Sequence, residues 1–177
     1  VEDMLKNAAL TLEDMEALAV SVGPGSFTGV RIGVAAVKGL AFSLNKPCAA
    51  VSTLEAMAYN FSGLPLDCTI CAAMDARCAQ VYAALFSCRA GEIARLTPDQ
   101  ALPITELVGR LESVNACADV SIGTNMDKAV EKCIILVGDG AQLCYNTLQG
   151  QVPGLILAPA HLRYQQAAGV AAVAEKL

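Results

Sequence analysis

The 177-residue sequence has a single histidine and lacks the short motifs on which most self-sufficient enzymes depend. One histidine excludes any metal site that is built on two. The nucleophile elbow G-x-S-x-G, the phosphate loop G-x-x-x-x-G-K-[ST] and the dinucleotide motif G-x-G-x-x-G are all absent. A serine triad would have to use His161, which has no marked serine partner. The sequence therefore predicts no catalytic residue, no metal and no cofactor.

Charged residues are also scarce, at 16% of the chain, against about 25% in an average soluble domain. Hydrophobic residues make up 55%, which excludes a disordered chain. Lys and Arg number 12 and Asp and Glu number 17, so the net charge is −5. An acidic chain lacks the basic surface that independent nucleic-acid binding requires. If RNA is involved, a partner must supply most of the phosphate contacts.

Targeting signals are equally sparse. Residues 1–10 carry Glu2 and Asp3 without a basic start, so we expect no signal peptide. We also expect no apolar run to reach the roughly 18 residues of a membrane span. Eight cysteines would suit a secreted disulfide scaffold in a small chain. Most of them lie in apolar runs, as do Cys117, Cys133 and Cys144, so we expect buried thiols and a cytoplasmic protein.

Hydrophobic periodicity predicts strands that alternate with helices, which is typical of an α/β fold. Strands are expected at residues 17–22, 48–51, 68–74, 80–87, 133–137 and 155–157, with 92–96 as a further candidate. Helices are expected at residues 26–44, 52–61, 104–112, 141–148 and 162–177, and the chain opens inside an amphipathic helix at Val1. We expect three regions: a first lobe of residues 1–62, a second lobe of residues 63–158, and a closing helix, 159–177, that returns towards the first lobe.

The strongest motif is Gly23-Pro-Gly-Ser-Phe-Thr-Gly-Val-Arg-Ile-Gly33. It predicts a strand end, a glycine-rich turn and a helix that begins after Ser26. The free N–H groups and the dipole of such a helix start can bind an anion. The alternative is a tight turn whose glycines permit close packing. Both interpretations stay open at the level of sequence.

The two sides of the helix predicted after this motif differ in the size of their residues. At about 100° per residue, one side carries the small residues Gly29, Gly33, Ala36 and Gly39. The other carries Phe27, Arg31, Val34, Lys38 and Ala41. We expect the small side to approach its own sheet and the bulky side to be buried against another subunit. The alternative is burial against the helix of the same chain that contains Met4 and Leu5. Arg31 and Lys38 are either snorkelling side chains or ligands of a partner's carboxylate or phosphate.

Three smaller motifs have structural and functional interpretations. Cys68 and Cys71 are three apart on a strand and therefore point to opposite faces, which argues against a zinc or redox site. Asp75 and Arg77 suit a local ion pair at a hairpin turn. The turn Gly138-Asp139-Gly140 follows a strand, where it could contact a nucleotide or serve as a plain loop.

Several of these blocks resemble the TsaB family, the dimerisation subunit of the bacterial complex that makes tRNA threonylcarbamoyladenosine. The resemblance is carried by 23–33, Lys38-Gly-Leu-Ala41, Val51-Ser52-Thr53-Leu54, Met74-Asp75-Ala76-Arg77 with Val81-Tyr-Ala-Ala84, and Val137-Gly138-Asp139-Gly140. It covers residues 1–140 in order and 159–177 more loosely. The family's opening strands, its Gly-Glu where this chain has Cys78-Ala79-Gln80, and its closing Tyr-Leu-Arg are absent. We therefore expect a chain truncated at its start and at its end.

The resemblance implies an actin-like, ribonuclease-H-like fold in two lobes, with the first lobe missing its opening strands. It implies a non-catalytic subunit that supports TsaD, which transfers a threonylcarbamoyl group to the adenosine next to the anticodon of tRNA. TsaE joins through the complex, tRNA is contacted only indirectly, and a homodimer is an alternative. The implied partner interface comprises Met4, Leu5, Ala8, Phe27, Val30, Arg31, Val34, Lys38 and Ala41. The motif and turn residues are Gly23, Pro24, Gly25, Ser26, Thr28, Gly29, Gly33, Ser52, Thr53, Asp75, Arg77, Gly138, Asp139 and Gly140.

Two other functions compete with this one. The first is a stand-alone enzyme, either a glycoprotease-like hydrolase or an actin-fold ATPase, which would need a metal or phosphate site of its own. The second is a structural homodimer without any role in tRNA modification.

Overall fold

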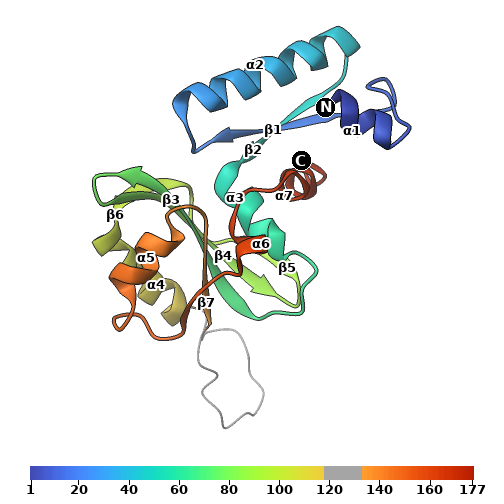
Figure 1. The fold of residues 1–177 in the computed structure, drawn as a ribbon. Coiled ribbons are helices and arrows are strands. Elements are labelled where there is room, and N and C mark those ends of the chain that lie inside the picture. Colours follow the sequence, from blue (N-terminus) through green and yellow to red (C-terminus); the bar gives the residue numbers. More distant parts are fainter. Residues whose placement is uncertain (118–132) are drawn as a thin grey trace.

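A computed structural model describes residues 1–117 and 133–177, with side chains up to Val114 and from Cys133 onwards. The first part of the chain forms a small sheet of two parallel strands, β1 (Leu18–Gly23) and β2 (Cys48–Ser52). The helix α2 (Phe27–Leu44) connects them and packs on one face of this sheet. A short helix, α1 (Glu2–Asn7), lies beside them at the start of the chain (Figure 1).

Local capping explains where α2 begins and ends. The Ser26 hydroxyl accepts a hydrogen bond from the Gly29 amide at 3.4 Å, which satisfies one of the free N–H groups of the first turn. Asn45 adopts a left-handed conformation with φ 51°, which stops the helix. The amide of Lys46 then donates to the carbonyl of Ala41 at 3.0 Å. The helix predicted over residues 26–44 is therefore confirmed.

The rest of the chain is organised around a second, six-stranded sheet. Its order is β5-β4-β3-β7-β8, and β6 also pairs with β4. The strands are β3 (Cys68–Arg77), β4 (Gln80–Arg89), β5 (Glu92–Arg95), β6 (Gln100–Pro103), β7 (Ile134–Val137) and β8 (Leu155–Leu157). The strands β3, β7 and β8 are parallel, whereas β4 runs antiparallel to β3, β5 and β6.

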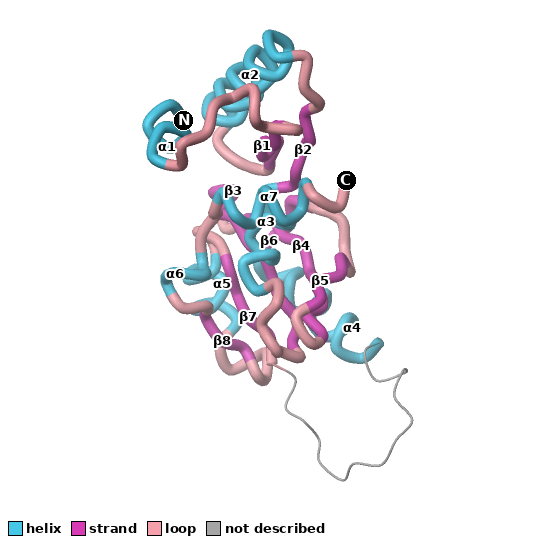
Figure 2. Tube along the Cα trace, turned by 90° about the vertical axis from the view of Figure 1, so that its right-hand side faces the viewer, coloured by secondary structure: helices cyan, strands magenta, loops and turns pink. Residues whose placement is uncertain are grey.

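Helices cover both faces of this second sheet, and each face has its own hydrophobic core. One core joins the sheet to α3 (Thr53–Ala58), to the 3-10 turn η1 (Tyr59–Phe61) and to α7 (Ala167–Ala174). The other joins it to α4 (Ile104–Cys117) and α5 (Ala141–Leu148). Figures 1 and 2 show α2 at one end of the molecule, with α3 and α7 between the two sheets. The second sheet is thus buried on both sides, and the first sheet contacts α2 as well as α3 and α7.

A polar network ties the end of the first sheet to the second. Arg95 contacts Glu55 at 2.6 Å and Asp99 at 2.5 Å, and Asp99 accepts a hydrogen bond from the Ser52 hydroxyl at 2.6 Å. Ser52 in turn accepts from the Glu55 amide at 3.2 Å and caps α3, as the sequence predicted. Burial opposes the charge of Arg95, but its bonds to Glu55 and Asp99 outweigh this and raise its pKa.

Four expectations from the sequence need correction. The closing helix is in fact two helices, α6 (Ala160–Arg163) and α7, because the Asn60 amide donates to the carbonyls of Leu162 and Tyr164 at 3.0 and 2.8 Å. These bonds satisfy the carbonyls at the end of α6. The strand β6 was not predicted, and α4 runs beyond Glu112 to Cys117. Cys48 in β2 is exposed rather than buried.

The hairpin between β3 and β4 has an unfavourable sequence for its turn. Arg77 pairs with Gln80, and the two residues between them, Cys78 and Ala79, have φ 51° and 57°. Two-residue turns with positive φ at both positions strongly favour Asn-Gly. We expect the double substitution Cys78→Asn and Ala79→Gly to raise the free energy of unfolding by about 1 kcal/mol in urea denaturation. The single change Cys78→Ser should have little effect, and a loss of stability in the double variant would contradict this turn geometry.

Candidate partner interface on α2

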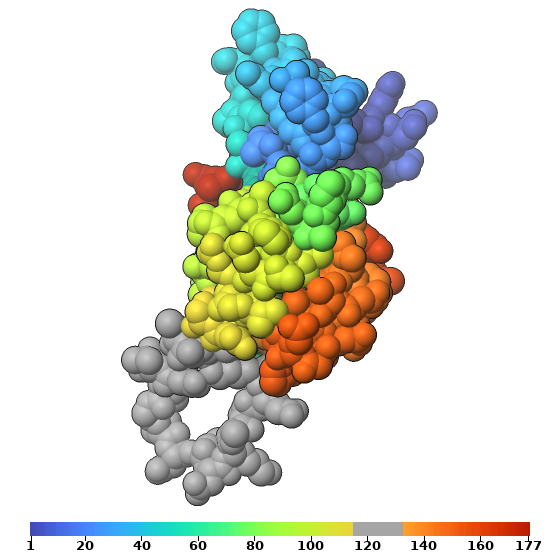
Figure 3. All heavy atoms as spheres, turned by 90° about the vertical axis from the view of Figure 1, so that its left-hand side faces the viewer, coloured from blue at the N-terminus to red at the C-terminus, as the bar shows by residue number. Residues whose placement is uncertain are grey.

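The exposed surface of α2 is unusually apolar. Phe27 is 70% exposed, Ile32 is 65% exposed and Phe42 is 91% exposed. The remaining exposed positions of the helix are Thr28, Gly29, Arg31, Ala35, Ala36, Lys38, Gly39 and Ser43. In Figure 3 the light-blue part of the chain forms one end of the molecule, and no other described segment lies over the side chains visible there. A soluble helix usually places polar residues on such a surface.

The predicted division of α2 into a small side and a bulky side is partly wrong. Val30 and Val34 are half-buried and Ala41 is 6% exposed, so these three residues, predicted at the partner interface, belong to the side that packs on β1 and β2. Gly29, Ala36 and Gly39 were expected to face the sheet, but they are exposed. A Cβ atom at Gly39 would meet nothing within 4 Å. Gly33 does face the sheet, since its Cβ would lie 3.9 Å from Val20.

The real division follows from the position of the sheet. The side towards the sheet carries Val30, Gly33, Val34, Val37, Leu40, Ala41 and Leu44. The opposite side therefore combines large apolar residues at its ends with small residues between them. Ile32 and Phe42 were not among the residues predicted for this surface. Phe42 lies 15 residues after Phe27, about 60° around the helix, so extending the projection to the last turn would have found it.

Two cationic side chains, Arg31 and Lys38, lie on this surface. The guanidinium of Arg31 stacks on the ring of Phe27, 3.9 Å from its centroid. Such a contact is worth about 0.5–1 kcal/mol at an exposed site. Lys38 is exposed about two turns further along. Arg31 thus lies against the apolar surface, with its charge over the face of the Phe27 ring.

The helix α1 does not cover this surface. Met4 is 66% exposed, Leu5 is half-buried and Ala8 is exposed. A groove of about 600 Å³ separates α1 and the loop after it from α2. The groove is lined by Val1, Glu2, Leu5, Lys6, Leu10, Thr11, Leu12, Glu13 and Leu40, of which α2 contributes Leu40. The alternative that Met4 and Leu5 bury the bulky side of α2 is therefore wrong.

The length of α2 corrects one further expectation. With 18 residues and a mean hydropathy of 1.4, it is the one helix within residues 1–117 and 133–177 that is long and apolar enough to cross a membrane. One helix that meets this criterion is weak evidence for a membrane protein.

The turn before α2 has a clear backbone requirement. Gly23 has φ +124°, a conformation that side chains rarely adopt, and a Cβ on Gly25 would lie 3.2 Å from Val30. Thr28 is exposed in the first turn of the helix. These glycines therefore fit the tight-turn interpretation of the motif. Anion binding at this helix start stays a prediction.

The second glycine turn joins β3 to β7 and α6. The amide of Gly140 donates to the Ala73 carbonyl at 3.1 Å, and that of Gly138 donates to the Arg163 carbonyl at 2.7 Å. The Asp139 carboxylate accepts from the Asp75 amide at 3.2 Å. Asp75 and Arg77 form the predicted ion pair at 3.5 Å. All of these contacts are made within the chain, so the turn connects the ends of β3 and β7 and the end of α6 by hydrogen bonds.

The close packing of this turn makes a matched pair of substitutions informative. Gly138 has φ +102°, and a Cβ on it would lie 2.0 Å from the Ala73 carbonyl oxygen. Gly150 also has a positive φ, +84°, but a Cβ there would meet nothing within 4 Å. We expect Gly138→Ala to lower the free energy of unfolding by roughly 2–4 kcal/mol and Gly150→Ala by about 1 kcal/mol. Equal losses in urea denaturation would show that the contact with Ala73 is unimportant.

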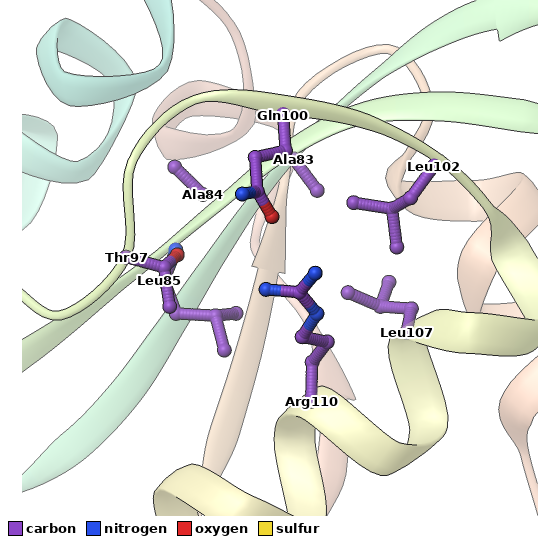
Figure 4. A pocket seen from close by; sticks show the side chains of 8 residues that line it. All are labelled: Ala83, Ala84, Leu85, Thr97, Gln100, Leu102, Leu107 and Arg110. Atoms are coloured by element: carbon purple, nitrogen blue, oxygen red, sulfur yellow. The ribbon is translucent and has the colours of Figure 1, made fainter.

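The remaining candidate sites offer little chemistry. Cys68 and Cys71 lie in different hydrophobic cores, which confirms that they point to opposite faces of the sheet. Within the described ranges, no group of three or more His, Cys, Asp or Glu residues is arranged to hold a metal ion. Figure 4 shows a small cavity beneath β4 and β6, which Arg110 enters from α4. Its volume of about 10 Å³ accommodates one water molecule.

Comparison with known proteins agrees with this architecture. The sequence profile described as "TsaD: tRNA N6-adenosine threonylcarbamoyltransferase" matches residues 1–176. TsaB of Bacillus subtilis is 38% identical over 112 residues, which are 63% of this chain and 48% of that protein. TsaB of Escherichia coli is 44% identical over 82 residues, 46% of this chain and 36% of that protein. The chain thus spans half or less of these relatives.

A solved structure extends the match over almost the whole chain. YeaZ from Pseudomonas aeruginosa superimposes with a TM-score of 0.70 at 28% identity and covers 99% of this chain and 72% of that one. The fold is therefore of the α/β, actin-like class, as predicted. Within that class, the chain belongs to the tRNA N6-adenosine threonylcarbamoyltransferase family, and the curated relatives it resembles are TsaB proteins.

Proposed function

We propose that this chain is a non-catalytic, dimerising subunit that supports TsaD during threonylcarbamoyl transfer to tRNA. The relatives at 38–44% identity are named tRNA threonylcarbamoyladenosine biosynthesis proteins. The profile that matches residues 1–176 describes the transferase itself. We propose that residues 1–62 carry the contact with the partner, that residues 63–158 support it, and that residues 159–177 connect the two.

The observation that carries this proposal is the uncovered apolar surface of α2. Phe27, Ile32 and Phe42 are each more than 60% exposed, although the opposite side of α2 packs on β1 and β2. Burying a large apolar side chain stabilises a complex by roughly 1.5–3 kcal/mol. The small residues between them, Ala35 and Gly39, let the backbone of a partner helix come close. The surface thus suits a helix of another polypeptide.

Charge favours a different protein over a second copy of this chain. The helix α2 carries Arg31 and Lys38 and no acidic residue. Two copies that packed α2 against α2 would bring like charges together around a shared axis. A partner surface with carboxylates opposite Arg31 and Lys38 avoids this repulsion. We therefore propose the heterodimer with TsaD, and the homodimer is an outcome of the test.

The other parts of the proposal follow from the composition of the chain. Its net charge of −5 leaves tRNA to be contacted through TsaD, because phosphate binding requires a basic surface. TsaE joins through the assembled complex, and the whole assembly acts in the cytoplasm. The described residues contribute no chemical step in this scheme. TsaD carries out the transfer.

Charged substitutions on the exposed surface test the interface. Val34 faces the sheet and would report on folding, so Phe27→Asp and Phe42→Asp are the suitable changes. Each would bury an unpaired carboxylate in the complex, which costs roughly 3–5 kcal/mol. We expect each variant to lose TsaD in co-purification with at least about 100-fold weaker binding. Leu143→Asp, at a residue of α5 that is 41% exposed, should bind normally.

The same variants test the role in cells. In cells depleted of the native subunit, the full-length protein should restore threonylcarbamoyladenosine in tRNA, and its Phe27→Asp variant should not. An intact complex with both aspartate variants would disprove the interface. Unchanged tRNA modification after depletion would instead favour a structural homodimer. Steady ATP turnover by the purified chain alone would favour the ATPase alternative.

A second prediction separates folding from assembly. Gly39 in α2 and Gly109 in α4 both have open space at the position of a Cβ. Since glycine disfavours helix interiors by about 1 kcal/mol, we expect Gly39→Leu and Gly109→Leu each to raise the free energy of unfolding of the isolated chain. Only Gly39→Leu should weaken the complex with TsaD, because it fills the space between Ala35 and Phe42. Normal binding by this stabilised variant would show that no helix packs there.

A further inference from the structure

Three cysteines stand side by side on three neighbouring strands of the second sheet. Cys68, the first residue of β3, is directly opposite Cys88 of β4 in the antiparallel ladder. On the other side of β3, Thr69 pairs with Ile134 of β7, and the Thr69 amide donates to the Cys133 carbonyl at 2.9 Å. Cys133 therefore lies beside Cys68. The row runs Cys88, Cys68, Cys133, with Cys68 in the middle.

The three side chains share one face of the sheet. Cys68 and Cys88 are buried in the same hydrophobic core, and Cys133 is half-buried and packs against that core. All three are free thiols. Burial, followed by the neighbouring thiols of Cys88 and Cys133, raises the pKa of Cys68 to about 12, and the charge of Arg89 opposes this rise. The thiols are thus close enough to influence one another.

The spacing of the row suits disulfide bonds. Residues directly opposite in an antiparallel ladder have Cα atoms about 4.5 or 5.5 Å apart, and disulfides join Cα atoms about 4.4–6.8 Å apart. A metal is a poorer occupant, because the described residues offer no group of ligands arranged to hold one. Access differs along the row: Cys88 is completely buried, Cys68 is 7% exposed, and the half-buried Cys133 is the most exposed of the three.

We propose that Cys133, Cys68 and Cys88 form a thiol relay through which an oxidised low-molecular-weight thiol installs a disulfide between Cys68 and Cys88. The order of the steps follows from burial along the row, since the most accessible sulfur, that of Cys133, is at one end and the most buried, that of Cys88, is at the other. This modification lies in the second lobe and is independent of the proposed function of α2.

Each step is a thiol–disulfide exchange. The Cys133 thiolate attacks one sulfur of the small disulfide and releases one thiolate, which takes up a proton. The Cys68 thiolate attacks Cys133 Sγ, which releases the second small thiolate and forms a Cys68–Cys133 bond. The Cys88 thiolate then attacks Cys68 Sγ and returns Cys133 to its reduced form. In total, Cys68 and Cys88 lose two electrons and two protons, and the small disulfide becomes two thiols.

The test uses the full chain with Cys48→Ser and Cys78→Ser, which remove the two cysteines that are exposed among the residues whose side chains the structure describes. The protein is incubated with oxidised glutathione, quenched in acid, alkylated, and mapped by mass spectrometry under non-reducing conditions. We expect one peptide pair linked through Cys68 and Cys88, with Cys133 alkylated. The rate should rise about tenfold per pH unit between pH 7.5 and 9, because the Cys68 thiolate is scarce far below its pKa.

Two variants test the order of the relay. Cys133→Ser should form the same bond at least about 10-fold more slowly, because oxidised glutathione must then reach the buried thiols directly. Cys88→Ala should instead stop at a bond between Cys68 and Cys133. Restoring Cys48 serves as the matched control, since this exposed cysteine is outside the row and should leave the rate unchanged.

Three results would overturn the proposal. The first is glutathione bound to Cys133 with no link between cysteines. The second is a bond that joins any pair outside the row, such as Cys71 with Cys144. The third is a Cys133→Ser variant that forms the bond at the original rate, which would remove Cys133 from the path.

Discussion

The helix α2 packs with one side on a sheet of only two strands, and this packing leaves its other side exposed. Its inner side packs on β1 and β2, and its outer side leaves Phe27 and Phe42 in solvent. A single aromatic side chain of this size offers roughly 1.5–3 kcal/mol on burial. The second sheet has no such reserve, because helices cover both of its faces. Among the described helices, α2 therefore leaves the most strongly exposed aromatic side chains, Phe27 at 70% and Phe42 at 91%.

Local signals predicted most of the helices and strands. Ser26, Asn45 and Ser52 act within a few residues of the ends that they define, so the sequence around each was sufficient to place α2 and α3. The break between α6 and α7 could not be found in this way. It depends on Asn60, which is about 100 positions earlier and donates to Leu162 and Tyr164. The strand β6 could not be predicted for a similar reason: it has four residues, ends in proline, and depends on its pairing with β4.

The candidate interface could be predicted as a segment but not as a surface. A helix that is apolar all round gives periodicity no way to tell which side meets the sheet. Val34 and Ala41 are apolar, so they would suit a subunit interface as well as a core, yet both side chains face the sheet. Gly39 looks like a contact point for a strand, yet it faces open space. Only the position of β1 and β2, set by tertiary structure, resolves the two sides.

Two glycines show the same limit of prediction from sequence, because tertiary structure decides the role of each. Gly138 must be glycine because the Ala73 carbonyl occupies the place of its Cβ, whereas Gly39 has room for any side chain in the isolated chain. Stability of this chain therefore explains Gly138 but gives no reason for Gly39, where alanine would make a better helix. Gly109 in α4 has the same open space, so a glycine of this kind indicates a contact only where the surface around it is also apolar. Gly39 meets this condition, because it lies on the side of α2 where Phe27, Ile32 and Phe42 are exposed, and the proposed partner helix would use that space for close approach.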